Sequence, residues 1–296
     1  GSAKAIGKQN QANAMPDGEV TSYDALRYFE EDKSSLIKSG REWYGQQLNI
    51  GQRKFTLPEF QFENIVPGSR LYLQTDFAAK ATTTSQIDVR VNGEPVYNHT
   101  VLGLKPDDFQ HARSNNHRSK FDADGSTYEV ELEYNVPTSS AKAWFNWAEL
   151  SARCQLRFTG NQMHFRDEFS TGNGKHARFI LENANSDTRI WEVTDPLNPK
   201  EVQALMQGSS MEFVLAVDEI REFVAFDGSD LKSPEFVEEI ENQNLHAIKN
   251  IDYLIITHPL FYDQAQRLAN FRQEHDGLSY QITTPEKIYN EFSSGD

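Results

Sequence analysis

The sequence is almost free of cysteine. Its 296 residues include one, Cys154, so no disulfide can form within the chain. No Cys-x-x-Cys pair exists, and no two of the eight histidines are four residues apart, the spacing that places two zinc ligands on one helix face. These absences argue against a disulfide framework and against zinc. They do not identify the compartment, because exported bacterial proteins often lack disulfides as cytosolic proteins do.

Positive charge is also scarce. Lysine and arginine total 29 against 44 aspartate and glutamate, which gives a formal net charge of -15. Such a surface repels phosphate backbones and anionic lipid, and no basic stripe offsets it. No apolar run approaches the roughly 20 residues of a membrane helix, and no signal peptide opens the sequence. We therefore expect no nucleic-acid partner and no membrane insertion by this chain.

Signatures of catalysis are missing as well. The sequence contains no Gly-x-Ser-x-Gly elbow and no phosphate-binding glycine loop. Cys154 alternates with apolar neighbours, which indicates a buried structural thiol. His258 follows an apolar strand, where open α/β sheets place ligands, but we interpret it as a loop residue that caps the next helix. His164, Asp167 and Glu168 follow a strand directly and are predicted to form a solvated turn.

The loop Asp122-Ala-Asp-Gly-Ser lacks the distal glutamate of a calcium-binding loop and is predicted to be a turn between strands. We accordingly assign no catalytic, cofactor-binding or metal-binding residue, and no cofactor.

Alternation of apolar and polar residues dominates residues 41–226. Ile87, Val89 and Val91 lie on one face of a predicted strand, and Asn92-Gly93 after them predicts a hairpin turn. Many short strands of this kind predict an antiparallel β-sandwich region, with a candidate break near residue 170. Residues 1–40 are interpreted as a tail or linker, disordered or loosely attached up to residue 22, with a short strand or helix after it.

The pattern changes over residues 227–296. Ser233-Pro234 predicts the start of a short helix, and residues 251–257 form a continuous apolar run typical of a strand buried on both faces. A helix is predicted after Pro259 and ends at Gly277, and after another strand Thr284-Pro285 opens a final helix. This β-α-β unit contains only two parallel strands. We therefore expect a truncated α/β domain, whose open sheet edge favours self-association.

Six segments resemble, in the same order, the region before and into the peptidase domain of a surface signal peptidase of the gingipain family of cysteine peptidases. The resemblance extends over residues 25–296. The matching segments are residues 39–48, 149–167, 191–199, 221–226, 242–259 and 264–296. It implies a β-sandwich region followed by the N-terminal part of a caspase-like α/β domain. The family's catalytic histidine and cysteine come after the segment that resembles residues 289–295, and Cys154 does not match the catalytic motif.

The function implied by the resemblance belongs to a larger protein. Such a peptidase, or sortase, removes the C-terminal sorting domain from cargo of the type IX secretion system and helps to attach the cargo to lipopolysaccharide. We expect this chain to be an inactive scaffold or docking fragment of that protein. The implied partners are cargo C-terminal domains, other type IX secretion components and lipopolysaccharide. The implied location is the cell surface, at the outer membrane of a Gram-negative bacterium.

A second interpretation stays open from the residues alone. The chain could be a stand-alone β-sandwich module that binds a surface glycan or protein. Trp43, Trp144, Trp147 and Tyr97 are candidates for stacking on sugar rings, although aromatic residues also build cores.

Overall fold

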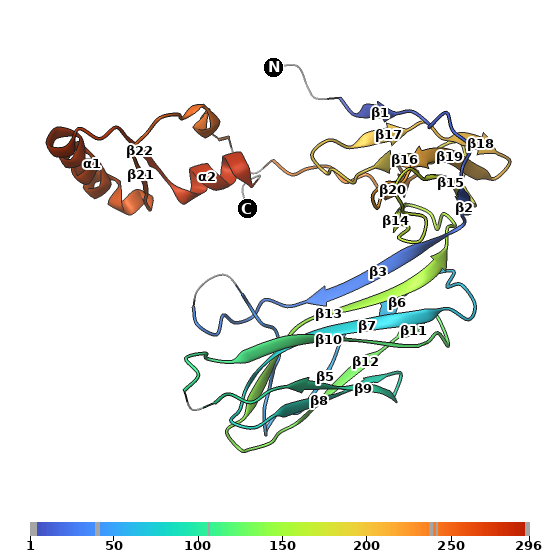
Figure 1. Ribbon diagram of the computed structural model, residues 1–296, viewed down its shortest axis with the longest axis horizontal. Coiled ribbons are helices and arrows are strands. Elements are labelled where there is room, and N and C mark those ends of the chain that lie inside the picture. The colour runs from blue at the N-terminus through green and yellow to red at the C-terminus, as the bar shows by residue number, and fades with distance from the viewer. Residues whose placement is uncertain (1–4, 39–41, 106, 237–238, 241, 294–296) are drawn as a thin grey trace. The chain divides into compact units, whose positions relative to one another are not determined.

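The computed structural model describes residues 5–38, 42–105, 107–236, 239–240 and 242–293. The chain divides into two compact units, Gly1–Leu231 and Lys232–Asp296. The first unit consists of β-strands, and the second contains two strands and two α-helices (Figure 1). This arrangement confirms the expectation of a mainly β protein.

The tail predicted over residues 1–40 is corrected by the structure. Strands β1 (Gly7–Gln9) and β2 (Gly18–Val20) lie in the part predicted to be disordered or loosely attached. Of the strand or helix expected after residue 22, the structure has the strand, β3 (Ser22–Glu30). β1 and β2 each pair in parallel with a later strand, and β3 pairs antiparallel with a long central strand. The first two are short and polar and are held by backbone hydrogen bonds, so they show no apolar alternation. The part of the prediction on residues 1–4 and 39–40 lies outside the described residues.

Two antiparallel sheets form the sandwich. One has the order β10-β7-β13-β3, with β4 also pairing with β13, and the other has the order β5-β12-β8-β9. The strands of the first sheet are β4 (Gln47–Leu48), β7 (Arg70–Lys80), β10 (Arg113–Asp122) and β13 (Lys142–Gln155). Those of the second are β5 (Lys54–Thr56), β8 (Ser85–Val91), β9 (Glu94–Val101) and β12 (Val130–Asn135). A short pair, β6 (Phe60–Gln61) and β11 (Thr127–Tyr128), lies beside them.

The core lies between the two sheets. The rings of Phe55 and Phe145 come from opposite sheets, and their centroids are 5.5 Å apart. Phe77 packs edge-on against Phe145 and is fully buried. The predicted hairpin is confirmed, because Asn92 and Gly93 join β8 to β9 with φ angles of 50° and 82°. Two left-handed residues in succession are what a tight two-residue hairpin requires.

A second pair of small sheets completes the first unit. Their orders are β1-β17-β16-β20-β14 and β18-β19-β15-β2. Phe165, Phe179, Phe213 and Phe223 pack with centroid separations of 5.0 to 5.3 Å and form their shared core. The strands are β14 (Gln162–Arg166), β15 (His176–Leu181), β16 (Arg189–Glu192), β17 (Lys200–Val202), β18 (Leu205–Gln207), β19 (Ser210–Ala216) and β20 (Glu222–Phe226).

The second unit is a β-α-β-α segment. Strands β21 (Tyr253–Ile256) and β22 (Tyr280–Thr283) pair in parallel, and α1 (Tyr262–Asp276) connects them. Gly277 ends α1 in the left-handed conformation, and the Thr284 side chain caps α2 (Pro285–Phe292), both as predicted. Short 3₁₀ turns, η1 (Leu245–Ala247) and η2 (Pro259–Phe261), flank β21.

Two predictions about this segment are wrong. The first is the short helix expected to start at Ser233-Pro234. Residues 231–236 are not helical, and residues 237–238 lie outside the described residues. The strand at residues 251–257 is not buried on both faces, because Leu254 is 51% exposed and Ile256 is 55% exposed. The apolar run therefore has a covered face and an open face. An apolar run shows only that a strand can be buried on both faces. Whether it is buried depends on other segments that pack against each face, and the run itself does not specify them.

Candidate functional site

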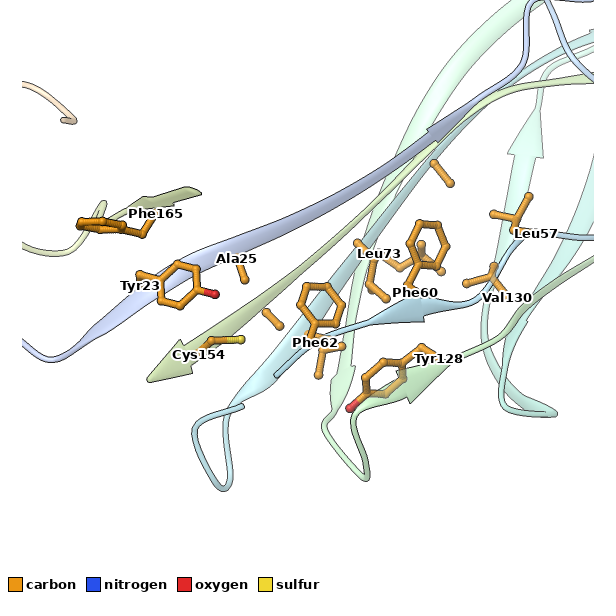
Figure 2. Close-up of a cluster of buried hydrophobic side chains, with 14 of the residues drawn as sticks. Tyr23, Ala25, Leu57, Phe60, Phe62, Leu73, Tyr128, Val130, Cys154 and Phe165 are labelled. Atoms are coloured by element: carbon orange, nitrogen blue, oxygen red, sulfur yellow. The ribbon is translucent and has the colours of Figure 1, made fainter. Parts of the chain in front are cut away.

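The thiol of Cys154 lies in the sandwich core. Figure 2 shows it among buried side chains that include Tyr23, Ala25 and Phe62. The residue is fully buried, and burial raises the pKa of the thiol to about 11. A thiol that stays protonated and inaccessible cannot act as a nucleophile. Cys154 is therefore a packing residue, as the sequence predicted.

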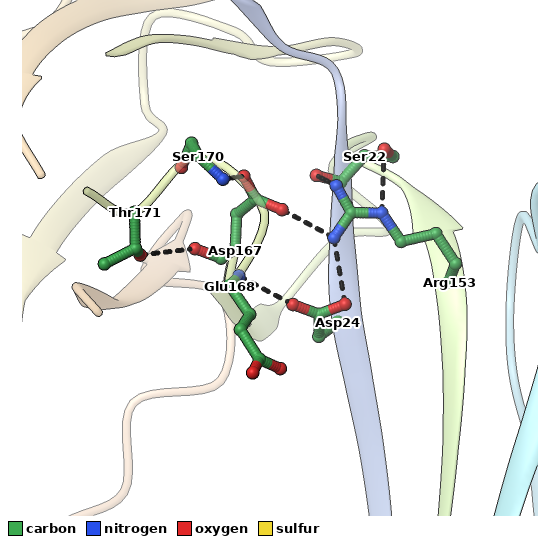
Figure 3. A network of polar contacts seen from close by, with 7 residues as sticks. All are labelled: Ser22, Asp24, Arg153, Asp167, Glu168, Ser170 and Thr171. Atoms are coloured by element: carbon green, nitrogen blue, oxygen red, sulfur yellow. Dashed lines mark hydrogen bonds and ion pairs between the residues drawn. The ribbon is translucent and has the colours of Figure 1, made fainter. Parts of the chain in front are cut away.

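The solvated turn predicted for His164, Asp167 and Glu168 is only partly correct, because His164 lies within strand β14. Glu168 is exposed, but Asp167 is buried, and its Oδ1 lies 2.6 Å from Nη1 of Arg153. Arg153 also contacts Asp24 at 2.9 Å and donates to the Ser22 hydroxyl through Nε. The second oxygen of Asp24 accepts from the backbone N–H of Glu168 (Figure 3). This network joins β3 and β13 to the loop after β14, and so connects the sandwich to the smaller sheets.

A groove of about 640 Å³ lies beside the Arg153 network. Its lining residues come from β3, β7, β10 and β13, from Arg166 of β14, and from the segments near residues 168 and 220. The lining includes Leu26, Tyr72, Arg118, Glu149, Ser151, Arg166, Glu168, Phe169 and Ile220. A second groove, of about 580 Å³, lies between β3 and β14 and is lined by Tyr23, Arg27, Glu63, His164 and Phe165 among others.

The histidines are dispersed. Within the described residues no three His, Cys, Asp or Glu side chains are grouped so that they could hold a metal ion. His258 caps η2, because its Nδ1 accepts from the backbone N–H of Leu260 at 3.1 Å, which confirms its predicted role. This hydrogen bond from Leu260 to His258 is a local contact with the backbone and not an arrangement for proton transfer.

A cluster that the sequence did not reveal surrounds Glu291 on α2. Its carboxylate accepts from the backbone N–H groups of Leu245 and His246, from Nδ1 of His246 at 2.7 Å, and from Gln243. Desolvation raises the pKa of Glu291, but these hydrogen bonds outweigh it and lower the pKa to about 2. The partners are 45 residues or more apart in sequence, so neither local motif indicated the other.

His246 and Glu291 have the composition of a general-base pair. The His246 ring also lies against Phe292, with centroids 4.4 Å apart. The same carboxylate accepts from two backbone N–H groups of η1, so the contact fastens η1 to α2.

The four aromatic candidates for sugar stacking occupy different environments. Trp144 is buried, in a small cluster with Tyr44 and Ala78. Tyr97 is half-buried, and its hydroxyl is hydrogen-bonded to Thr75. Trp43 is exposed, and Trp147 stacks on Tyr28 with centroids 5.9 Å apart. Only Trp43 and Trp147 remain as surface candidates.

The second unit exposes many large apolar side chains. Its buried cluster consists of Ala265, Ala269 and Ile282. The exposed apolar residues of β21, η2 and the two helices are Leu254, Ile256, Leu260, Phe261, Tyr262, Leu268, Phe271, Tyr289 and Phe292. An apolar surface of this kind marks a site of association. Among the described helices, none combines the length and the apolarity that crossing a bilayer requires.

Comparisons with known proteins relate the chain to one peptidase family. Residues 246–296 match the sequence model of Peptidase family C25. The crystal structure of dimeric latent PorU from Porphyromonas gingivalis superposes with a TM-score of 0.80 over 98% of this chain, at 21% identity. The chain spans 28% of the length of that PorU chain. No curated protein matches the sequence.

Carbohydrate-binding modules also match, but weakly. The CBM36-1 domain of a xylanase from the hindgut metagenome of Trinervitermes trinervoides has a TM-score of 0.29 at 7% identity, over 43% of this chain and 95% of that domain. A family 35 module from Clostridium thermocellum has a TM-score of 0.28 at 12% identity, over 43% and 90%. Scores this low carry no argument. The resemblance drawn from the sequence is confirmed by the C25 match and by the shared fold with PorU.

Proposed function

We propose that this chain is a non-catalytic scaffold and docking part of a cell-surface cysteine peptidase related to family C25. The observation that carries the proposal is the coincidence of two matches. The parallel β-α-β segment matches the C25 family, and a PorU-like fold extends over nearly the whole chain. A stand-alone binding module has no need for such a segment, whereas a peptidase builds its active-site sheet from it.

The described residues support a structural role. The one thiol is buried with a raised pKa, His258 caps η2, and His246 contacts the Glu291 carboxylate that fastens η1 to α2. In the gingipain family the catalytic histidine and cysteine follow the region that this chain resembles. In this chain, the exposed apolar residues of β21 and α1 offer a surface on which further strands and helices of a caspase-like peptidase domain would pack.

The chemistry that we propose for the whole protein is acyl transfer. A cysteine thiolate would attack the peptide carbonyl that precedes the C-terminal sorting domain of a type IX secretion cargo protein, and the sorting domain would leave with a protonated amine. Water or an amine of lipopolysaccharide would resolve the thioacyl intermediate. The sandwich would hold cargo, lipopolysaccharide or another secretion component near the peptidase domain at the outer membrane.

The first test reads the genomic reading frame beyond the codon for Asp296. We expect further strands, a histidine and a cysteine in a peptidase context. Replacing that cysteine by alanine at the chromosomal locus should leave surface cargo with its sorting domain attached, as an immunoblot of cargo size would show. A native stop codon directly after Asp296 would contradict the peptidase proposal.

The scaffold role needs a separate variant in the same host. Arg153→Met removes the cation that joins the sandwich to the smaller sheets, and cargo processing should decline although no catalytic group has changed. Arg178→Met is the matched control, because its contact with Glu19 is longer, at 3.6 Å, and both side chains are exposed. Full processing in the Arg153 variant, at normal protein abundance, would show that this region is dispensable.

A further inference from the structure

The outer face of the β10-β7-β13-β3 sheet presents an ordered array of side chains. The strand register places Arg118, Gln74, Glu149 and Tyr28 in one row across the four strands. The next row contains Lys120, Tyr72, Ser151 and Leu26. Tyr28 is 52% exposed and Tyr72 is 40% exposed, so the array is open to solvent where the structure describes it. We call these two rows the outer face.

Aromatic rings stand on this face at two positions. Tyr28 stacks on Trp147 at one edge, and Tyr72 lies nearer the opposite edge, beneath the guanidinium of Arg118 at 4.7 Å. Tyrosine and tryptophan offer a large, rigid and partly polar contact surface that loses little conformational entropy on binding. Their positions on paired strands fix the rings before any ligand arrives.

The residues between the rings are polar. Glu149 and Ser151 on β13 lie between Tyr28 on β3 and Tyr72 on β7, and Gln74 lies two residues from Tyr72 on β7; they supply carboxylate, hydroxyl and amide groups. A face of this kind is unsuited to an apolar helix or to another sheet, which would leave those groups without partners. It is suited to a ligand that presents flat apolar patches and many hydroxyl groups. An oligosaccharide has that chemistry.

One edge of the outer face is basic although the protein carries a net charge of -15. Arg118 and Lys120 both lie exposed on β10, and Arg70 lies near them on β7. Arg70 has a loose contact with Asp122 at 3.5 Å. Among the described residues no carboxylate forms an ion pair with Arg118 or Lys120, so this edge is complementary to an anion. A planar guanidinium held on a tyrosine ring matches a carboxylate well.

We propose that the outer face binds an acidic oligosaccharide, with its sugar rings on Tyr28 and Tyr72 and a carboxylate on Arg118. The groove of about 640 Å³ continues from this face toward Phe169, which is 78% exposed, and provides a side wall for the chain of sugars. The three residues that carry the proposal, Tyr28, Tyr72 and Arg118, all lie on the sandwich. The proposal holds or fails independently of the relationship to peptidases.

The test titrates the full chain with tetragalacturonate by isothermal calorimetry, with galactotetraose as the neutral probe of the same length. We expect saturable 1:1 binding of the acidic probe that weakens with added salt, and binding at least about tenfold weaker for the neutral probe. Arg118→Gln should weaken binding of the acidic probe at least about tenfold and abolish the preference for it. Tyr28→Ala should weaken binding of both probes.

Matched controls locate the effect. Arg90→Gln removes a cation from the opposite sheet, and Tyr289→Ala removes a tyrosine of similar exposure, 49%, from the second unit. Both should bind as the wild type does. Circular dichroism of each variant checks the fold, and Gln74→Ala replaces Tyr28→Ala if the latter is unstable. Absence of saturable binding of the acidic probe would overturn the proposal. Unchanged affinity in both the Arg118→Gln variant and the Tyr28→Ala or Gln74→Ala variant would also overturn it, as would equal binding of the neutral probe.

Discussion

The two units of the chain achieve their stability in different ways. In the first, fully buried aromatic and aliphatic side chains fill the space between sheets; Phe77, Phe145 and Tyr134 are completely inaccessible to solvent. In the second, the buried cluster is made of two alanines and one isoleucine, while Phe271 and Ile256 are more than half exposed. The first unit buries its apolar surface within itself. The second displays it.

The difference shows what each unit needs from its surroundings. A two-stranded sheet with one principal covering helix buries too little apolar area to be stable independently. The sandwich has two opposed sheets and needs no partner for its core. We therefore expect the second unit to unfold at lower denaturant concentration than the first, and to self-associate through the open edges and apolar faces of β21 and α1.

The largest expected effect comes from truncating a ring in the sandwich core. Phe77→Ala should lower the free energy of unfolding of the first unit by about 3 to 5 kcal/mol, because the cavity adds to the lost transfer energy. Urea unfolding followed by tryptophan fluorescence measures it, since all four tryptophans lie in the first unit.

Phe271→Ala is the counterpart in the second unit. That ring is 53% exposed, so its removal should lower the free energy of unfolding of the second unit by about 0.5 kcal/mol or less. It should also reduce self-association, which light scattering measures. A large loss of stability from Phe271→Ala would show that this ring is buried in solution, and the contrast between the units would fail.

The next largest effect concerns the junction inside the first unit. Arg153→Met leaves the buried carboxylate of Asp167, whose side chain is 3% exposed, without its cation. We expect a loss of about 3 kcal/mol in the free energy of unfolding. The double variant Arg153→Met with Asp167→Leu should recover much of it, because an apolar pair of similar volume can replace a buried ion pair. A double variant no better than the single one would assign the loss to packing of the arginine stem.

The sequence predicted most of the sandwich and little of the polar contacts. Alternation identified β8, and Asn92-Gly93 identified the hairpin that follows it, because these signals are local. β1 and β2 were missed because their pairing partners lie more than 150 residues away. The Glu291 cluster, whose partners are 45 to 48 residues apart, and the Arg153–Asp167 pair were missed because only tertiary folding brings those side chains together, and no local motif marks them. The four residues of one row of the outer face come from four separate segments, so only strand register could assemble them.

A smaller effect is expected from a buried histidine in the sandwich. His99 is fully buried between Thr75, whose hydroxyl is 2.9 Å from Nδ1, and the Asn115 carbonyl, 3.1 Å from Nε2. Burial lowers the pKa of His99 to about 4. Between pH 6.5 and 4 the unfolded chain therefore binds more protons at this residue than the folded one, and stability falls as the pH falls through that window.

His99→Gln should remove about 2 to 3 kcal/mol of this pH dependence, measured as the difference in unfolding free energy between pH 7 and pH 4. The comparison with wild type is essential, because burial raises the pKa of Asp76 to about 6. Between that pH and the ordinary aspartate pKa, the free energy of unfolding contributed by Asp76 rises as the pH falls, opposite to the contribution of His99. Identical slopes in variant and wild type would contradict a neutral buried His99.

The smallest and most local effect is expected at Glu291, whose hydrogen bonds fasten η1 to α2 in a unit that has only a small apolar core. Because hydrogen bonding lowers its pKa to about 2, the stabilisation is fully present above pH 4.5 and is lost as the pH falls toward 2. Glu291→Gln removes the charge but keeps the shape. We expect the amides of Leu245 and His246 to exchange hydrogen faster in the variant at neutral pH, with the difference disappearing toward pH 2. Hydrogen-exchange mass spectrometry of residues 243–248 measures it, with Glu286→Gln, also on α2, as the control. Equal exchange in variant and wild type at neutral pH would mean that the carboxylate does not fasten η1 to α2, and that the second unit depends even more on the surface it displays.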